Sequence, residues 1–217
     1  MDGEITPTAT PAASIRPHPE YLSIMDPIEE FRALFAQAQA VDRAKLPDPT
    51  AMSLATVGAD GAPSVRIVLL KSVDERGFVF YTNLESRKGR ELIATPRAAL
   101  CFYWAPLDTQ IRVEGAVEPV SDAEADAYFG SRARESQIGA WASRQSETLE
   151  SMDALRARVA EVEARFANVP VPRPPYWTGR RVKPSSIEFW HAGAYRLHER
   201  RRFERDGDRW SMRRLFP

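Results

Sequence analysis

The middle of the chain contains five short segments: AMSLATV (residues 51–57), SVRIVLLKSV (64–73), GFVFYTN (77–83), AALCFYW (98–104) and QIRVEGAVEPV (110–120). Each is rich in β-branched and aromatic residues, which favour extended strands. The first three are joined by GADGAP and DERG, whose Asp and Gly residues are typical of hairpin turns. We therefore expect a run of antiparallel strands.

Helices are expected to flank these strands. Asp26 is a predicted N-cap, and the spacing of the apolar residues after it predicts a helix over 27–40. LESRKGRELIATPR (84–97) predicts a short helix that ends before its proline. A capping box at 121–124 and the helical spacing of apolar residues over 146–166 predict further helices.

Further strands are predicted in SSIEFWHAG (185–193) and in YRLHERRRFERDGDRWSMRRLF (195–216), with an Asp-Gly hairpin turn at 206–207. Six or seven antiparallel strands favour a mainly β, α+β fold, a closed or split barrel with peripheral helices, over alternating βαβ units. We expect one domain over residues 25–217. The Pro-rich segment 1–24 has little apolar surface and is predicted to be a flexible arm.

The composition excludes several classes of protein. Lys plus Arg equals Asp plus Glu at 30 each, so no net charge draws the chain to nucleic acid or to an anionic membrane. Cys101 is the single cysteine, so no internal disulfide is possible, and the three histidines show no metal-ligand spacing. Without a signal peptide or a membrane-spanning apolar stretch in the sequence, we expect a cytoplasmic protein.

Two clusters of cations are candidate phosphate sites. Arg66 and Lys71 lie in one apolar strand, where buried cations need anionic partners. Ser86, Arg87 and Lys88 begin a helix directly after a strand, so hydroxyl, backbone N–H groups and cations could converge there on a phosphate. The alternative is that both groups are solvent-exposed charges at the ends of elements.

A third cluster is Tyr128, Arg132 and Ser136, which recur every four residues and would share one face if the backbone is helical. They could hold a second phosphate, or they could form an exposed polar helix face. A fourth cluster is Arg196, His198 and Arg200, which period-two alternation places on one face of a strand. This row suits an anionic or electron-rich ligand; the alternative is a solvent-facing hairpin with weak ion pairs.

Taken together and in this order, the motifs resemble the pyridoxine/pyridoxamine 5′-phosphate oxidase family from about Asp26 to Pro217. The resemblance is carried by DPTAMSLATV (48–57), RIVLLK (66–71), GFVFYTNLESRKGREL (77–92), YFGSRARESQIGAWASRQS (128–146), IEFW (187–190), RLHER (196–200) and the closing RRLFP.

The resemblance implies a split-barrel homodimer that binds FMN at the subunit interface. The residues it implies for FMN are Arg66, Lys71, Tyr81, Thr82, Arg87, Lys88, Gln110, Gln145, Ser146, Trp190 and Arg200. Those it implies for the substrate are Lys71, Tyr128, Arg132, Ser136, Arg196 and His198, with Arg196 and His198 as the catalytic pair. The implied reaction oxidises pyridoxine or pyridoxamine 5′-phosphate to pyridoxal 5′-phosphate and reduces O₂ to H₂O₂.

Two alternatives stay open. At Thr178, Gly179 and Arg180 the chain departs from the Gly-Gly-aromatic stretch usual in the family, which allows a related flavin oxidase of the phenazine-pathway type with another substrate. A non-catalytic module that binds flavin or pyridoxal phosphate is the second alternative. No nucleic-acid, membrane or metal partner is expected.

Overall fold

A computed structural model describes residues 26–217, and the arm predicted at 1–24 lies outside the described residues. The described chain forms these helices and strands: α1 (Pro27–Ala40), β1 (Ala51–Val57), β2 (Pro63–Leu69), β3 (Ser72–Asp74), β4 (Gly77–Asn83), α2 (Arg87–Ala94), β5 (Arg97–Trp104), β6 (Thr109–Pro119), α3 (Asp122–Gly130), α4 (Arg134–Ala142), α5 (Met152–Arg165), β7 (Trp177–His191), β8 (Glu199–Asp206) and β9 (Arg209–Arg214). No described helix is both long and apolar enough to cross a membrane.

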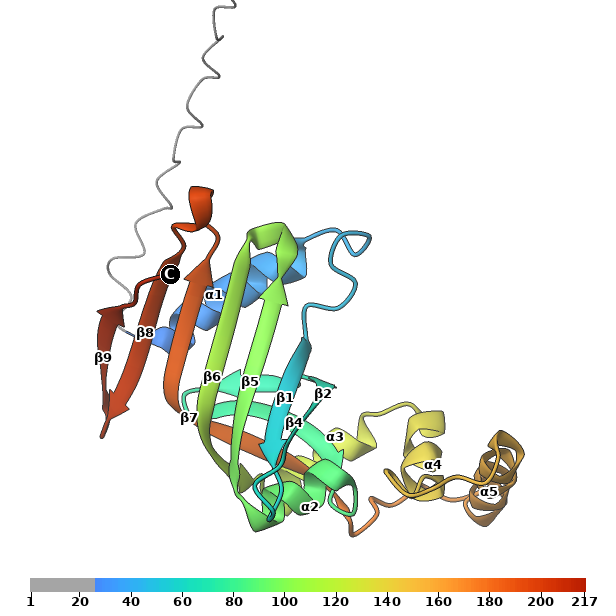
Figure 1. The fold of residues 1–217 in the computed structure, drawn as a ribbon. Coiled ribbons are helices and arrows are strands. Elements are labelled where there is room, and N and C mark those ends of the chain that lie inside the picture. Colours follow the sequence, from blue (N-terminus) through green and yellow to red (C-terminus); the bar gives the residue numbers. More distant parts are fainter. Residues whose placement is uncertain (1–25) are drawn as a thin grey trace, which may run out of the picture.

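One antiparallel sheet contains all nine described strands, in the order β2-β1-β5-β6-β7-β4-β3, and β8 and β9 extend it beyond one half of β7. β2 and β3 lie at opposite ends of this order, although only Leu70 and Lys71 separate them in the chain. The sheet must therefore curl until its two ends approach each other (Figure 1). This curl is the split barrel, and it confirms the predicted fold class.

One predicted strand is wrong in its length. The segment 64–73 was expected to be a single strand, but it divides into β2, which pairs with β1, and β3, which pairs with β4. At the division the backbone N–H of Leu70 donates to Thr50, whereas that of Lys71 donates to Val79. The backbone therefore changes its partner strand at Leu70 and Lys71, from the β1 side of the curl to the β4 side.

The barrel interior is filled by aromatic rings from α1 and from strands β4, β5, β7 and β8. Phe31 of α1 is fully buried, with its ring centroid 4.8 Å from that of Phe78 and 5.0 Å from that of Phe102. Trp104 packs on the same cluster. The predicted helix over 27–40 is confirmed, and its cap is the Asp26 carboxylate, which accepts from the Ile28 N–H at 2.8 Å. Helix α1 thus closes one side of the core.

The predicted capping box fixes the start of α3. The Ser121 hydroxyl accepts from the Glu124 N–H at 3.2 Å, and the Glu124 carboxylate accepts from the Ser121 N–H at 3.1 Å. We expect Ser121→Ala to lower the free energy of unfolding by about 1 kcal/mol, since one helix N–H loses its partner. Urea denaturation checks this, and Ser121→Thr, which keeps the hydroxyl, should stay close to the wild type. Equal losses in both variants would contradict the capping role.

Candidate active site

A cleft of about 690 Å³ opens where the ends of β2 and β4 meet α2 and the α3–α4 segment. Many of the residues predicted for ligand binding line it: Lys71, Tyr81, Thr82, Lys88, Tyr128, Arg132, Ser136 and Gln145. They come from segments that are far apart in the sequence and that the curl of the sheet brings together. The cleft therefore joins the second and third predicted clusters.

The start of α2 forms one end of the cleft. Ser86 is its N-cap, and its hydroxyl accepts from the Gly89 N–H at 3.2 Å. A side chain on Gly89 would lie 2.3 Å from the carbonyl oxygen of Leu84, so the tight passage from β4 into α2 requires glycine. The positive end of the helix dipole lies at this end of the cleft, beside Lys88.

The loop after α4 docks onto this helix start. The Lys88 ammonium donates to Gln145 Oε1 at 2.7 Å and to Ser86 Oγ at 3.1 Å. The Arg87 N–H donates to Ser146 Oγ at 3.1 Å. Ser146 has a φ of 77°, in the left-handed region that non-glycine residues seldom occupy. The resemblance placed Gln145 and Ser146 with Arg87 and Lys88, and these contacts bring the four residues together.

Glu91 is a site residue that the sequence analysis missed. Its buried carboxylate accepts from Arg87 Nε at 2.8 Å and from Arg66 Nη2 at 3.2 Å, and it also accepts from the hydroxyls of Thr56 and Ser64. Burial alone would raise the pKa of Glu91, but these hydrogen bonds and the charge of Arg66 lower it to about 2. The four-residue spacing from Arg87 to Glu91 was the available signal.

The electrostatic balance at the start of α2 suits a dianion. Arg66, Arg87 and Lys88 face one carboxylate, that of Glu91, which leaves a surplus of two positive charges. Burial and the neighbouring Arg66 lower the pKa of Lys88 to about 8. A phosphate monoester carries close to two negative charges at neutral pH, so this group of residues fits it in both charge and hydrogen-bond donors.

The third predicted cluster, Tyr128, Arg132 and Ser136, comes together in the cleft, but its residues do not lie on one helix. α3 ends at Gly130 and α4 begins at Arg134, so Tyr128, Arg132 and Ser136 lie on α3, in the intervening turn and on α4. The prediction that the three residues share one helix face is therefore wrong, because the turn at 131–133 interrupts the helix. All three side chains nevertheless line the cleft, together with Lys71.

Arg132 is a cation with an unsatisfied hydrogen-bond donor among the described residues. Its guanidinium lies 4.9 Å from the ring of Trp177 and 5.5 Å from that of Phe129. Its Nη1 atom is buried and has no hydrogen-bond partner among the described residues, and burial lowers the pKa of Arg132. Trp177 also stacks with Tyr81, which in turn stacks with Tyr128 at 3.9 Å. A buried donor held over aromatic rings is costly unless a ligand pairs with it.

The departure at 178–180 leaves the strand pairing intact. Gly179 pairs with Tyr81 and Thr178 with Thr82 in a regular β4–β7 ladder. A side chain at Gly179 would lie 2.7 Å from Val120 and 2.8 Å from the Tyr81 ring, so glycine is required for this close approach. The departure therefore leaves the neighbouring cleft residues Tyr81, Thr82 and Trp177 paired in the sheet.

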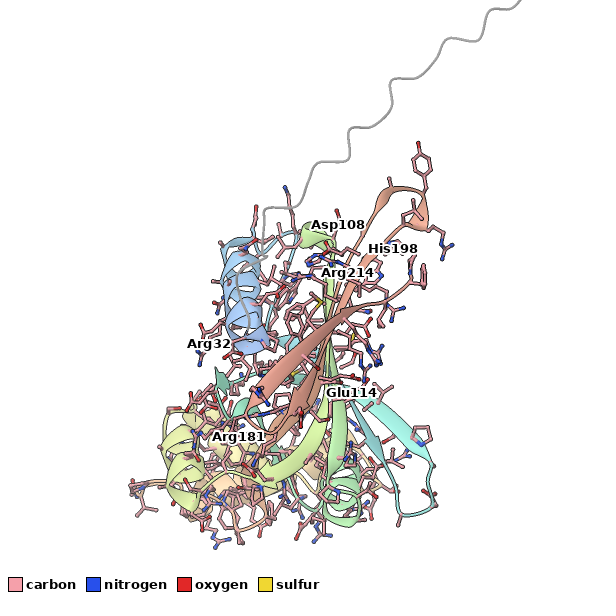
Figure 2. All side chains as sticks on the ribbon, turned by 90° about the vertical axis from the view of Figure 1, so that its left-hand side faces the viewer. Arg32, Asp108, Glu114, Arg181, His198 and Arg214 are labelled. Atoms are coloured by element: carbon pink, nitrogen blue, oxygen red, sulfur yellow. The ribbon has the colours of Figure 1, made fainter. Side chains whose placement is uncertain are left out.

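The fourth cluster, Arg196, His198 and Arg200, does not line the cleft, and neither do Gln110 and Trp190, which the resemblance implies for FMN. Gln110, Trp190 and Arg200 form a row across β6, β7 and β8, and none of them lines the cleft. In Figure 2, His198 lies at the end of the molecule opposite to Arg181, which pairs with Glu124 of α3. A single protomer therefore does not bring this row to the cleft.

Arg196 and His198 do not lie on one face of a strand, so the prediction from the period-two alternation of the sequence is wrong. β8 begins only at Glu199, and the chain before it forms a short 3-10 turn in which Tyr195 and Arg196 have φ values of 56° and 64°. This loop folds back so that the Gly193 N–H donates to His198 Nδ1 at 3.2 Å, and the His198 ring lies 4.6 Å from that of Trp190. The compact turn prevents the extended conformation that the prediction required.

Residues 38–166 match the family model described as pyridoxamine 5′-phosphate oxidase, and residues 177–217 match the model of the pyridoxine 5′-phosphate oxidase C-terminal dimerisation region. Two curated relatives are named pyridoxine/pyridoxamine 5′-phosphate oxidase. The protein from Myxococcus xanthus (strain DK1622) is 60% identical over 88% of this chain and 92% of its own length. The protein from Thermosynechococcus vestitus is 56% identical over 88% of this chain and 89% of its own length.

Among solved structures, PhzG from Burkholderia lata in complex with tetrahydrophenazine-1-carboxylic acid is 38% identical, with a TM-score of 0.85 over 92% of this chain and 97% of its own. An FMN-binding protein from Nostoc punctiforme described as related to pyridoxamine 5′-phosphate oxidase has a TM-score of 0.68 at 16% identity, over 88% of this chain and 98% of its own. The second likeness shows the fold alone.

The curled sheet and its cation-lined cleft define a split-barrel protein. The chain belongs to the pyridoxamine 5′-phosphate oxidase family, an oxidoreductase family of flavoproteins. It is thus an oxidoreductase whose C-terminal residues match a dimerisation region.

Proposed function

We propose that the protein is an FMN-dependent oxidase that converts pyridoxine 5′-phosphate and pyridoxamine 5′-phosphate into pyridoxal 5′-phosphate. O₂ is the final electron acceptor and becomes H₂O₂; the amine substrate also consumes water and releases ammonia. The observation that carries the proposal is a cleft with two separate cationic groups, one at the start of α2 and one around Arg132 and Lys71. Two groups suit two phosphate-bearing molecules, a cofactor and a substrate.

The first group fits the FMN phosphate. Its surplus of positive charge, the N-terminal N–H groups of α2 and the hydroxyls of Ser86 and Ser146 would hold a phosphate monoester. Tyr81, Thr82 and Gln145 line the adjoining wall of the cleft. When bound, FMN supplies the acceptor for a hydride equivalent from the C4′ carbon of the substrate and passes the electrons to O₂.

The second group fits the substrate phosphate. Arg132 offers a buried guanidinium nitrogen, Nη1, that has no hydrogen-bond partner among the described residues, and Lys71, Tyr128 and Ser136 add an ammonium and two hydroxyls. Holding the phosphate at one end orients the pyridine ring, because a fixed end restricts the poses of a small rigid molecule. Orientation is then the main contribution of the protein to the rate.

We propose further that the active form is a homodimer. The Gln110, Trp190 and Arg200 row, with Arg196 and His198 beside it, would reach the cleft of a second copy. Two observations support this: the match to a dimerisation region, and the exposed apolar side chains of Val65 and Ile67 on β2, at 68% and 63% exposure. Residues 26–217 would act as one unit in the cytoplasm.

The experiment that tests the function is an anaerobic titration of FMN-loaded protein with pyridoxine 5′-phosphate. We expect the visible absorbance of the flavin to bleach and to return when air is admitted. Substrate binding without bleaching would instead favour a non-catalytic binding module.

The likeness to PhzG favours one second candidate, an oxidase of the same fold that acts on a phenazine precursor. Tetrahydrophenazine-1-carboxylic acid should then be oxidised faster than pyridoxine 5′-phosphate. Arg132 favours the phosphorylated substrate, because its buried Nη1 donor, which has no hydrogen-bond partner among the described residues, suits a dianion.

A pH dependence of FMN binding follows from Lys88. Its pKa in the flavin-free protein is about 8, and a bound phosphate should raise it. Below pH 8 the ammonium is already charged, whereas above pH 8 binding must take up a proton. We expect the Kd for FMN to rise by up to about tenfold per pH unit above 8.

Flavin fluorescence quenching between pH 6.5 and 9.5 measures this dependence. Lys88→Arg serves as the matched control, since a guanidinium stays charged over the whole range and its Kd should change little. The same rise of Kd in both proteins would assign the titration to another group.

A further inference from the structure

The Arg200 guanidinium forms hydrogen bonds within its own chain through all three of its nitrogens. Glu188 Oε1 accepts from Arg200 Nε at 2.9 Å and from Nη2 at 2.7 Å. The Nη1 atom donates to the carbonyl oxygen of Phe216 at 3.0 Å, and the Leu215 N–H donates to the Arg200 carbonyl at the same distance. All three nitrogens of this side chain are therefore engaged before any ligand binds.

Glu188 is the buried centre of this arrangement. Its side chain is 4% exposed, and it lies on β7 between the neighbouring strands β6 and β8. The other carboxylate oxygen accepts from Arg112 at 3.4 Å. A buried carboxylate is stable only with cations around it, so Glu188 and Arg200 depend on each other for their placement.

We propose that Glu188 and the C-terminal tail, residues 215–217, are positioning elements for Arg200 and, through it, for the flavin cofactor. This inference rests on the proposed function, in which Arg200 contacts FMN. Arginine has a long, flexible side chain, and ordering it only when a ligand binds would weaken that binding. The pair of contacts orders it in advance, which explains why a glutamate occurs within IEFW and why the chain continues past β9 to RRLFP.

The neighbouring acid Glu114 offers a matched control. It lies on the same outer face and pairs with Arg112 and Arg202, but it has no contact with Arg200. Its side chain is 35% exposed, so it resembles an ordinary surface ion pair. Glu114→Gln therefore removes one negative charge from this face while keeping the direct contacts of Arg200 with Glu188 and Phe216.

A double-mutant cycle tests the proposal, with the Kd for FMN measured on full-length protein by fluorescence quenching. We expect Glu188→Gln and Arg200→Ala each to raise the Kd by about tenfold, because the first loses the partner that orients Arg200 and the second loses the proposed contact with FMN. The double variant should be no weaker than Arg200→Ala alone, because Glu188 acts through Arg200. Glu114→Gln should bind FMN as the wild type does.

The tail is tested by a pair of variants that differ in one backbone carbonyl. A chain ending at Leu215 loses the Phe216 acceptor, whereas Phe216→Ala keeps it. We expect the shortened chain to bind FMN several-fold more weakly and Phe216→Ala to match the wild type. The Nε–H resonance of Arg200 in ¹⁵N NMR spectra of flavin-free protein should be sharp in the wild type and Phe216→Ala, and broadened or exchanged in Glu188→Gln.

The outcomes distinguish a failure of the positioning role from a failure of the proposed function. Additive losses in the cycle, or an unchanged Nε–H resonance in Glu188→Gln, would overturn the positioning role while leaving the proposed function intact. A wild-type protein that fails to bind FMN, or an Arg200→Ala variant with full affinity, would overturn the positioning role together with the proposed cofactor contact of Arg200. Thermal denaturation of each flavin-free variant shows whether a loss of affinity comes from unfolding.

Discussion

Replacing Arg196 by alanine should lower kcat/KM for pyridoxine 5′-phosphate by about a thousandfold, the upper range for loss of one preorganised donor at a reacting centre. The affinity for FMN should stay within about twofold, because Arg196 is proposed to touch the substrate and not the cofactor. Steady-state kinetics on FMN-saturated protein and a separate FMN titration measure the two quantities.

The loop conformation is the reason for expecting so large an effect. Tyr195 and Arg196 both occupy the left-handed region, which costs about 1–3 kcal/mol for each non-glycine residue and persists only where the surroundings enforce it. A side chain on Gly193 would lie 1.9 Å from the Leu197 carbonyl oxygen, so the loop closes too tightly for any other residue. Strain of this kind clusters at functional sites, which supports the proposed role of Arg196.

Arg209→Ala is the control for this prediction. Arg209 is exposed on β9 and is likewise an arginine of the C-terminal region, but it lies outside the proposed site. It should leave kcat/KM unchanged. Undiminished turnover in Arg196→Ala would remove the catalytic role of this residue.

Arg132→Ala should raise the KM for phosphorylated substrates by about a hundredfold, since a charge-assisted bond from a buried guanidinium to a dianion is lost. The effect should depend on the phosphate: the ratio of kcat/KM for pyridoxine 5′-phosphate to that for pyridoxine should collapse. Arg132→Lys keeps the charge but loses the planar fork over the Trp177 ring, so it should recover part of the ratio.

Folding must be monitored in this experiment, because Arg132 packs on Phe129 and Trp177. Thermal denaturation of flavin-free protein provides that check. If phosphorylated and unphosphorylated substrates lose activity to the same degree, Arg132 supports the cleft wall and does not bind the substrate phosphate.

Local signals predicted much of the architecture. The Asp26 cap, the Ser121 capping box and the Asp206 hairpin turn lie where the sequence indicated, because each depends on hydrogen bonds within a few residues. Period-two segments likewise marked most strands. The start of α2, where we propose that a phosphate binds, was recognisable since its cations, cap and preceding strand are contiguous in the chain.

The errors arise where the conformation depends on distant partners. The division of 64–73 into β2 and β3 depends on the curl of the whole sheet, and the turn at 131–133 depends on where α4 packs. Glu91 was missed because its partners Thr56, Ser64 and Arg66 come from other strands. The left-handed pair at 195–196 has no sequence signal, since neither residue is Gly or Asn.

The place of β7 in the sheet has a consequence for the order of synthesis. β7 pairs with β6 on one side and with β4 on the other, so until Trp177–His191 has been made, the earlier strands form two unconnected pieces with open edges. Such edges recruit other chains, and long-range pairing of this kind slows folding. A ribosome-bound chain should therefore stay incompetent for ligand binding until its last segment emerges, and chains that terminate early should aggregate and not persist as soluble fragments.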